Sequence, residues 1–446
     1  GLYDNSVAGL VERVTDHLAN PAPYLPRQRF WTVRAKQTVL GTGALERHIA
    51  FGNNDRPGIM SVNAGRAYLN RYGVLPGDDI IVATNNDSAY KPALELASAG
   101  ATVRLFDTRK RTPELEKDCN ISMVPEAVPI NAHGPKGIRG LETTASDDIE
   151  SCDLLLVSGG WSPVVNLLSH RGVKLVWGDQ IACFVPADTN EPIHVAGSVA
   201  GIWNCEQCET SGRVAGAAAA TALGKTAPDI KMSSAQITQG GGWALPIKPL
   251  YEVKVPGRKL KSFVDFQHDV TTEDVRLAHR EGFRTVEHLK RFTTLGMATD
   301  QGKVGNIIGM ALMAEALDKN IYDMGTTTSR PPYTPVSLGA LGGRHVDGHF
   351  RPLRRTPLHA WNLAHSAIMT LAGLWQRPWY FPREGETIKD AYIREATVVR
   401  STVGLCDITS LGKIAVQGPD ATEFLNRVYT NQFARLPIGK ARYGIM

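Results

Sequence analysis

Three short apolar runs, each ending in a glycine-containing turn, constrain the fold of this chain more than any other feature. They cover residues 38–44 (TVLGTGA), 154–160 (LLLVSGG) and 193–198 (IHVAGS). Short apolar runs bounded by glycine are typical of buried parallel strands, and glycine at the carboxyl end of a strand lets the backbone approach a ligand closely. The sequence therefore predicts an α/β fold with ligand-facing strand ends.

The order of these turns resembles the signatures of two-lobed flavoprotein reductases, in which one nucleotide lobe is interrupted by a second and then resumes. The resemblance implies a two-lobed FAD/NAD(P)-binding scaffold of the glutathione-reductase-like kind. We expect a first dinucleotide-binding lobe at 1–60, an inserted Rossmann-like lobe at 61–165 and a return to the first lobe at 166–228. The GxGxxG motif of the first lobe would precede Gly1, and the chain stops at Met446 within a patterned segment. We therefore expect a piece of a larger subunit, truncated at both ends.

The inserted lobe contains a complete Rossmann-type unit, with a strand at 79–83, a helix at 89–98 and a strand at 101–107. The loop between the first strand and the helix has the sequence TNNDSAY and no glycine. Glycines in such a loop let backbone amides contact a pyrophosphate, whereas an acidic side chain repels it. Because Asp87 lies in this loop, we expect the second nucleotide site to be lost, although Asp107 is typical of a ribose partner.

The third glycine turn leads into GIWNCEQC at 201–208, followed by an alanine-rich helix expected from about 212 to 222. This arrangement resembles the segment that closes over the cofactor with a helix N-terminus in two-lobed flavoproteins. The resemblance implies nucleotide contacts, to NAD, at Ala196, Gly197, Trp203 and Cys205.

Cys205 and Cys208 form a CxxC pair that could be redox-active or bind a metal, because a helix N-terminus lowers the pKa of a thiol. A single CxxC without a second pair nearby is weak support for either role. We favour two unlinked structural cysteines and assign no metal site.

Composition excludes several classes of partner. A chain of 446 residues should hold more than one core. The formal charge of +5 is spread along the chain, with one modest cluster at Arg344, Arg351, Arg354 and Arg355, so no nucleic-acid partner is expected. The longest small and apolar run, 214–223, is shorter than the ~18 residues of a spanning helix, so no membrane role is expected. Six cysteines in such a chain indicate a reducing compartment, and we expect a cytoplasmic protein.

Residues 259–306 predict a compact helical module within the expected segment 229–343. Residues 271–274 (TTED) form a capping-box signal for a helix that Gly282 ends, and Thr285 caps a second helix ending near Phe292. The layout resembles the small ferredoxin-like [2Fe-2S] domains of amine and opine oxidoreductases. Such a cluster needs about four thiolates, and this stretch has no cysteine. The sequence therefore predicts the module without its cluster.

Four motifs carry a more specific resemblance. They are FGNNDRPG at 51–58, VDFQHDVT at 264–271, EHLKRFTTLGMATDQGK at 287–303 and GTTTSRPPYTP at 325–335. They resemble the α subunits of heterotetrameric sarcosine oxidases, and the similarity runs over essentially the whole chain. The resemblance implies a subunit that holds a non-catalytic NAD and shares an FMN with the β subunit. It also implies γ and δ subunits as further partners, and an FAD in the partner β subunit, where sarcosine is oxidised.

The helical module contains a stretch rich in hydrogen-bond donors that could bind a flavin phosphate in place of the lost cluster. We assign FMN-interface contacts to Arg291, Thr293, Thr294 and Gln301. A solvated helix end with a capped loop is the alternative. The turn at 330–333 (RPPY) is expected to be a rigid linker.

The segment 344–446 resembles the opening of the folate-binding aminomethyltransferase α+β fold. Residues 403–420 (VGLCDITSLGKIAVQGPD) should contain a strand with the GKI-V-GPD pattern, followed by a helix and by GKARY at 439–443. The resemblance implies that Tyr443 lies near tetrahydrofolate, while a simple core aromatic remains the alternative. Ser410-Leu411 replaces the usual His-Met, and the expected downstream carboxylate is missing. We assign no catalytic residue.

The resemblance implies oxidative demethylation of sarcosine with O2 and tetrahydrofolate to glycine, H2O2 and 5,10-methylenetetrahydrofolate. One alternative is a scaffold subunit that holds cofactors without chemistry of its own. The other is a subunit of a related N-methyl amine or opine dehydrogenase, with electrons leaving through an iron–sulfur centre. The missing cysteines at 259–306 argue against that electron path.

Overall fold

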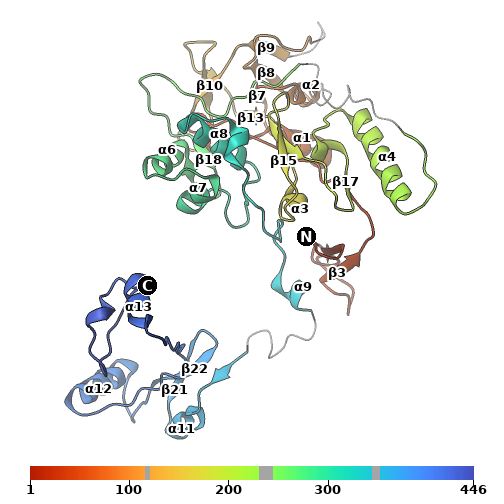
Figure 1. Ribbon diagram of the computed structural model, residues 1–446. Helices are drawn as coiled ribbons and strands as arrows, with labels where there is room; N and C mark the ends of the chain where they lie inside the picture. Colours follow the sequence, from red (N-terminus) through yellow and green to blue (C-terminus); the bar gives the residue numbers. More distant parts are fainter. Residues whose placement is uncertain (116–120, 231–244, 344–351) are drawn as a thin grey trace. The chain divides into compact units, whose positions relative to one another are not determined.

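A computed structural model describes residues 1–115, 121–230, 245–343 and 352–446 (Figure 1). The chain divides into two compact units, Gly1–Leu341 and Gly342–Met446, and each is described by itself. Arg344 and Arg351 of the expected basic cluster lie outside the described residues, whereas Arg354 and Arg355 form the short strand β20. No helix among the described residues is long and apolar enough to cross a membrane.

The centre of the first unit is a five-stranded sheet in which every neighbouring pair is parallel. Its order is β6 (Ile59–Ser61), β13 (Leu154–Ser158), β7 (Asp79–Thr84), β8 (Thr102–Asp107) and β9 (Ile121–Pro125). The strand–helix–strand unit predicted from the sequence is confirmed as β7, α2 (Tyr90–Ser98) and β8. A 3-10 turn, η1 (Asp87–Ala89), leads into α2.

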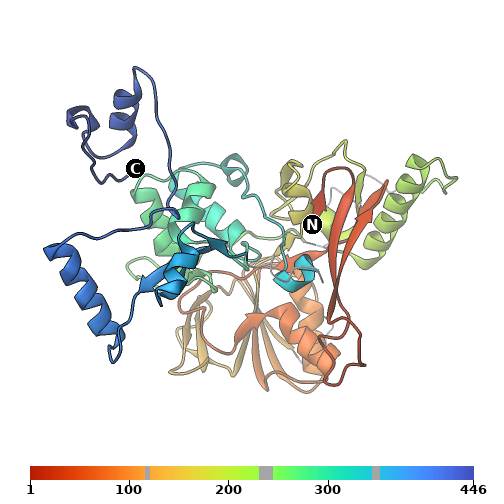
Figure 2. The ribbon, with the colours of Figure 1, turned by 90° about the horizontal axis from the view of Figure 1, so that it is seen from below.

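The two faces of this sheet are covered differently, because successive side chains of a strand point to opposite faces. Ile80 and Val82 belong to a core shared with α1 (Val62–Tyr72) and α2. Ile81 and Ala83 belong to a core shared with the antiparallel strands β10 (Pro129–His133) and β11 (Gly140–Thr143). Figure 2 shows the two helices beside the sheet. Burial on both faces explains why these strands are almost continuously apolar.

The remaining strands flank this sheet in small groups. Strands β1 (Leu2–Tyr3), β2 (Val7–Arg13) and β3 (Gln28–Arg34) form a three-stranded antiparallel sheet. Strands β4 (Thr38–Leu40) and β17 (Ile193–Val195) form a parallel pair. Two antiparallel pairs are formed by β5 (Ala44–Glu46) with β14 (Trp161–Pro163) and by β15 (Leu175–Gly178) with β16 (Cys183–Pro186). The short α3 (Asn166–Ser169) follows β14, and β12 (Glu150–Ser151) pairs with β11.

Helix α4 (Cys205–Ala222) corrects one prediction, since it begins at Cys205 rather than near residue 212. Asn204 is its N-cap, and its side chain accepts hydrogen bonds from the amides of Glu206 and Gln207. Asparagine is a favoured N-cap residue because its side chain satisfies amides that have no partner within the helix. The sequence contains this capping residue, but the helix was predicted from its alanine-rich part, which begins only after the two cysteines.

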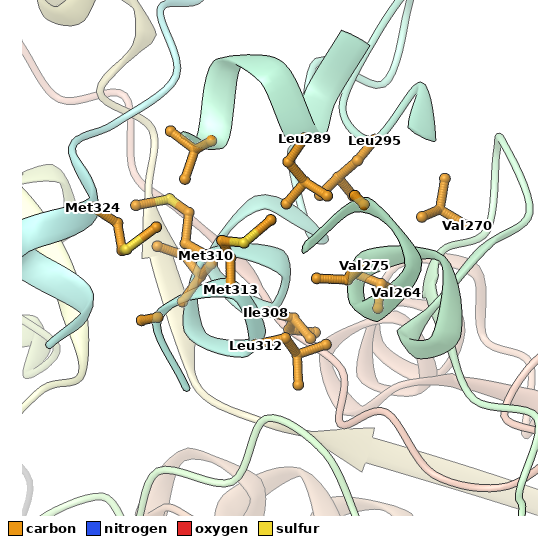
Figure 3. Close-up of a cluster of buried hydrophobic side chains, with 14 of the residues drawn as sticks. Val264, Val270, Val275, Leu289, Leu295, Ile308, Met310, Leu312, Met313 and Met324 are labelled. Carbon is orange, nitrogen blue, oxygen red and sulfur yellow. The ribbon is translucent and has the colours of Figure 1, made fainter. Parts of the chain in front are cut away.

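The helical module consists of the short strands β18 (Phe263–Asp265) and β19 (Val270–Thr271) and three helices, α6 (Thr272–Arg280), α7 (Val286–Thr293) and α8 (Asn306–Ala316). The predicted capping box at Thr271 and Asp274 and the cap at Thr285 are confirmed. Helix α8 was not predicted, because most of its residues are buried and it shows no polar face. Figure 3 shows Leu289 and Leu295 directed toward Met310 and Met313 of α8 in one apolar core. The turn η4 (Ile321–Met324) and α9 (Leu338–Gly342) follow.

The second unit has a three-stranded sheet of β20, β22 (Trp375–Tyr380) and β21 (Ile368–Ala372), with α11 (His359–Ala364), α12 (Ile388–Ser401), α13 (Ala421–Val428) and η5 (Phe433–Arg435). The expected strand with the GKI-V pattern is wrong for this structure, since residues 412–417 form no strand. Ile414 is 90% exposed there, and no described strand lies alongside to accept its backbone hydrogen bonds. The helix expected after it is α13.

Candidate functional site

The first candidate site is the edge at which β4 and β17 end. The two strands are parallel, with Leu40 opposite Val195, so their carboxyl ends meet at one edge. Gly43 and Gly197 adopt positive φ values of 77° and 72°. A Cβ atom added at Gly41 or Gly43 would meet nothing within 4 Å. This open edge leaves room for a ligand to contact the backbone directly.

The structure brings only some of the predicted NAD contacts together at the open edge. The amide of Ala196 donates to the Leu40 carbonyl at 2.9 Å, and the amide of Gly197 donates to Ser211 Oγ at 3.2 Å. The Trp203 ring lies 6.3 Å from the Trp161 ring, and Cys205 is exposed on the first turn of α4. Because the amides of Glu206 and Gln207 already donate to Asn204, the strand ends are better placed than the helix N-terminus to hold a nucleotide.

The sequence did not predict that Ser211 and Cys208 lie beside Gly197 at the open edge. A Cβ atom added at Gly197 would lie 3.7 Å from Cys208 Sγ, and this thiol donates to the Ile202 carbonyl at 3.2 Å. Both cysteines of the pair are free, and burial raises the pKa of Cys208. This direction is opposite to the one a reactive cysteine requires. Within the described ranges, no group of three or more potential metal-ligand side chains is found.

A second strand edge, where β7 and β8 end, carries large charged side chains in place of small residues. Asp107 is fully buried and accepts from Arg109 Nη2 at 2.8 Å and from the Tyr90 hydroxyl at 2.8 Å. Arg109 Nη1 also donates to Asp87 Oδ1 at 2.7 Å. Both carboxylates that a nucleotide would meet here are therefore bound to one buried guanidinium.

Residues 245–248 (LPIK) pack over the ends of β7 and β8, which we call the filled edge. The Leu245 amide donates to Asp87 Oδ2 at 3.0 Å, and Lys248 Nζ donates to the Thr108 carbonyl at 2.9 Å. Asn85 exchanges two hydrogen bonds with the backbone of Lys248, at 3.1 and 3.0 Å. The crevice outside the ends of β7 and β8, where a dinucleotide would bind in this fold, is occupied by protein atoms.

A third candidate site is a cationic cavity of about 670 Å³ on the helical module. Its lining residues are Glu287, Lys290, Arg291, Gly296, Met297, Ala298, Gln301, Thr326, Thr328, Arg330, Pro331 and Pro332. Arg291 and Gln301 are two of the four predicted FMN contacts. The other two are not among the lining residues: Thr293 Oγ1 donates to the Leu289 carbonyl at 2.7 Å, and Thr294 is the left-handed C-cap of α7.

The charges around the cationic cavity do not cancel. Arg291 pairs with Glu287 at 3.0 Å. In the part of the chain that the structure describes, no ion pair joins Lys290 or Arg330 to a carboxylate. Three cations and one carboxylate therefore give the lining a net charge of about +2, which favours a dianion.

The loop after α7 forms part of the cavity wall and has an unusual backbone. Thr294, Ala298 and Gln301 have φ values of 65°, 48° and 49°. Side chains other than glycine in this region cost on the order of 1–3 kcal/mol each, and such residues cluster at ligand sites. The left-handed stretch therefore marks the cavity as a candidate binding site, independently of its charge.

Two titratable groups with shifted pKa values lie on β5 and just after it, of which Glu46 is buried and His48 is half-buried. Burial raises the pKa of Glu46 to about 7, and its carboxyl group accepts from the Asn63 amide of α1 at 2.7 Å. Desolvation lowers the pKa of His48 to about 4, and its Nε2 lies 3.2 Å from the Phe263 carbonyl. The pKa of Glu46 is therefore raised and that of His48 lowered, so the two groups change the stability of the fold with pH in opposite directions.

Tyr443, the predicted folate contact, lies in the second unit with its side chain fully exposed. Leu405 and Ile438 are also fully exposed there. The described part of this unit encloses no aromatic site around Tyr443, and the folate assignment stays a prediction.

Parts of this chain are similar to known protein families and to solved structures. Residues 259–345 match the family described as "Sarcosine oxidase A3 domain", and residues 358–446 match the "GCVT N-terminal domain". The crystal structure of L-proline dehydrogenase from P. horikoshii has a similar fold, with a TM-score of 0.56 and 21% identity, over 71% of this chain and 60% of that chain.

Two relatives align with the whole chain. "Sarcosine oxidase subunit alpha" of Rhizobium meliloti (strain 1021) is 43% identical over 100% of this chain and 45% of its own length. The subunit of the same name from Corynebacterium sp. (strain P-1) is 40% identical over 100% of this chain and 48% of its own length. The chain is therefore similar to sarcosine oxidase α subunits along its entire length, and it spans about half the length of these curated relatives.

Proposed function

We propose that this chain is part of the α subunit of a sarcosine oxidase, which oxidises sarcosine with O2 and transfers the one-carbon unit to tetrahydrofolate. The products are glycine, H2O2 and 5,10-methylenetetrahydrofolate. The observation that carries the proposal is the 43% identity to a sarcosine oxidase α subunit along the whole chain. We assign the oxidation itself to an FAD in the β subunit, with γ and δ subunits completing the complex. The role of this chain is to hold and position cofactors.

The cationic cavity fits an FMN shared with the β subunit. A phosphate monoester carries close to two negative charges at pH 7, which matches the net charge of the cavity lining. Lys290, Arg291 and Arg330 can donate charge-assisted hydrogen bonds to its oxygens. FMN supplies electron-transfer chemistry when it is bound.

The open edge fits a non-catalytic NAD. The small residues Gly41 and Gly43 leave open space beside the backbone, as a dinucleotide site requires. The filled edge offers no comparable space, so we propose one nucleotide per chain, held by the lobe formed from residues 1–60 and 166–228. The inserted lobe, 61–165, keeps its fold without a ligand.

The second unit supplies the beginning of a tetrahydrofolate-binding domain. The match of residues 358–446 to the GCVT N-terminal domain supports this part of the proposal. Tyr443 is the residue we assign to the folate.

The test is to purify the full-length subunit with and without its β partner, denature it and identify the released nucleotides. We expect one NAD per α chain, FMN only when both subunits are present, and sarcosine-dependent O2 uptake only by the complex. Release of FAD from the α chain alone, together with sarcosine oxidation, would contradict the assignment of the chemistry to the partner. A complex with no activity on sarcosine would favour the scaffold alternative or another N-methyl amine.

A further inference from the structure

Residues 329–333 (SRPPY), which we name the strap, form a wall shared by three cavities. Arg330, Pro331 and Pro332 line the cationic cavity. The whole strap lines a second cavity of about 460 Å³, which also contacts Thr42 beside the open edge. Ser329 and Tyr333 line a third, of about 90 Å³. The position of the strap therefore decides the shape of the cationic cavity and of the space near the open edge.

Gln301 holds the strap through its side-chain amide. Its Nε2 donates to the Arg330 carbonyl at 2.8 Å and to the Pro332 carbonyl at 3.1 Å, while its Oε1 accepts from the Arg330 amide at 2.9 Å. The amide thus pairs with both backbone groups of Arg330, as a neighbouring strand would. These bonds occupy the groups with which Gln301 could otherwise bind a ligand.

Two further side chains hold the chain at Tyr333, the last residue of the strap, and at Thr328, the residue before it. Lys303 Nζ donates to the Tyr333 carbonyl at 3.1 Å and lies 4.6 Å from the centre of the Tyr333 ring. Glu287 accepts from the Thr328 amide at 3.3 Å, and it also pairs with Arg291. Gln301 differs from both because it binds the residue whose side chain supplies a cation to the cavity. Its own backbone is left-handed, a strained conformation that the three amide bonds help to maintain.

We propose that Gln301 is a positioning residue that fixes Arg330 in the wall of the cationic cavity, and that it sets the affinity of this cavity for a phosphate monoester through Arg330. The ligand class rests on the proposed function, in which the monoester is FMN. Gln301 itself does not contact the ligand. The sequence predicts Gln301 as an FMN contact, and the present proposal gives it a role that acts through Arg330 instead.

The experiment compares Gln301→Met, Arg330→Met and the double variant in the α–β complex, with FMN as the probe. Each single substitution should weaken FMN binding by roughly tenfold, the effect of losing one charge-assisted hydrogen bond. The double variant should be no weaker than Arg330→Met alone, because Gln301 acts only through Arg330. Gln267→Met is the matched control: the Gln267 amide bonds to Thr299, which does not line the cavity, and FMN binding should stay unchanged.

A second measurement does not depend on the ligand. Hydrogen exchange at the Arg330 amide should become faster in Gln301→Met and stay unchanged in Gln267→Met, because the first substitution removes its acceptor. Additive losses in the double variant, or unchanged exchange at Arg330, would overturn the positioning role even if FMN binds. A wild-type complex that neither contains nor binds FMN would instead overturn the proposed ligand, whatever the exchange data show.

Discussion

The open edge and the filled edge are the same structural feature with opposite outcomes. Both are carboxyl ends of neighbouring parallel strands, the position at which this class of fold binds nucleotides. At the open edge the residues are small, and two glycines have left-handed backbones. At the filled edge the residues are large and charged, and Arg109 forms ion pairs with both Asp87 and Asp107. The difference teaches that protein side chains can occupy a strand edge of this kind and satisfy its polar groups.

The largest effect should follow from breaking the filled edge at its centre. Asp107→Ala leaves the Arg109 guanidinium buried with only Asp87 as counterion, and it leaves the Tyr90 hydroxyl without its acceptor. Removing one partner of a buried pair costs about 3–5 kcal/mol, so the free energy of unfolding should fall by that amount.

Chemical denaturation measures this loss. Asp79→Asn is the control, because Asp79 pairs with Arg104 at a partly exposed position, and exposed pairs contribute at most about 1 kcal/mol. If filling the edge has replaced the ligand, the NAD content should stay at the wild-type value in Asp107→Ala. A loss of NAD by this variant under folded conditions would mean that the second edge also binds a nucleotide.

A second prediction concerns the pH dependence of stability that Glu46 and His48 produce. The folded-state pKa of Glu46 is about 7, above its ordinary value of 4.5, so the folded protein binds more protons and loses stability as pH rises through this window. The full loss is about 3 kcal/mol for a group that is almost completely buried. The folded-state pKa of His48 is about 4, below its ordinary value of 6.5, so it adds stability as pH rises from 4 to 6.5.

The two effects should nearly cancel between pH 4.5 and 6.5, and single substitutions should separate them. In Glu46→Gln, stability should rise with pH over this range, and in His48→Gln it should fall. Thermal denaturation at half-unit pH steps measures both slopes. Equal slopes in both variants would show that neither group titrates as its burial requires.

At the open edge, Gly197→Ala tests whether the left-handed backbone is required. A side chain at a φ of 72° costs on the order of 1–2 kcal/mol of stability, and it also crowds the position where a nucleotide would contact the backbone. Gly216→Ala is a matched control on the exposed face of α4, where the same change should stabilise the protein by about 0.5–1 kcal/mol. We expect chemical denaturation to show a lower stability for Gly197→Ala and a higher stability for Gly216→Ala. NAD should be lost only from Gly197→Ala. Retention of NAD by Gly197→Ala would remove this residue from the nucleotide site.

The smallest effect is expected at the segment that covers the filled edge. Lys248→Met removes the hydrogen bond from Nζ to Thr108 but leaves the two backbone bonds with Asn85. One hydrogen bond from a largely exposed side chain contributes about 0.5–1 kcal/mol, so the free energy of unfolding should fall by no more than that amount. A loss several times larger would mean that the lysine charge, and not the backbone of residues 245–248, keeps the filled edge closed.

Local signals predicted several elements correctly for identifiable reasons. The strand, helix and strand from β7 to β8 were predicted because a buried apolar run, a helical pattern and a glycine boundary follow one another in the sequence. The caps of α6 and α7 were predicted because a capping residue and its partner lie three positions apart. Helix α8 could not be predicted in this way, since an almost wholly buried helix shows no periodic polar face. The strand expected at 412–417 failed because a strand also needs a neighbour.

By itself, the sequence determined the class of fold, the absence of phosphate-loop glycines at 84–90 and the similarity to a sarcosine oxidase α subunit. Only the tertiary structure decided which residues fill the second edge. Asp87 meets Arg109, and residues 245–248 cover both from far along the chain. Likewise, only the fold placed Arg330 against Gln301. The physical reason is that hydrogen bonds of buried polar groups are satisfied by whichever segments packing brings together, and sequence spacing does not specify those segments.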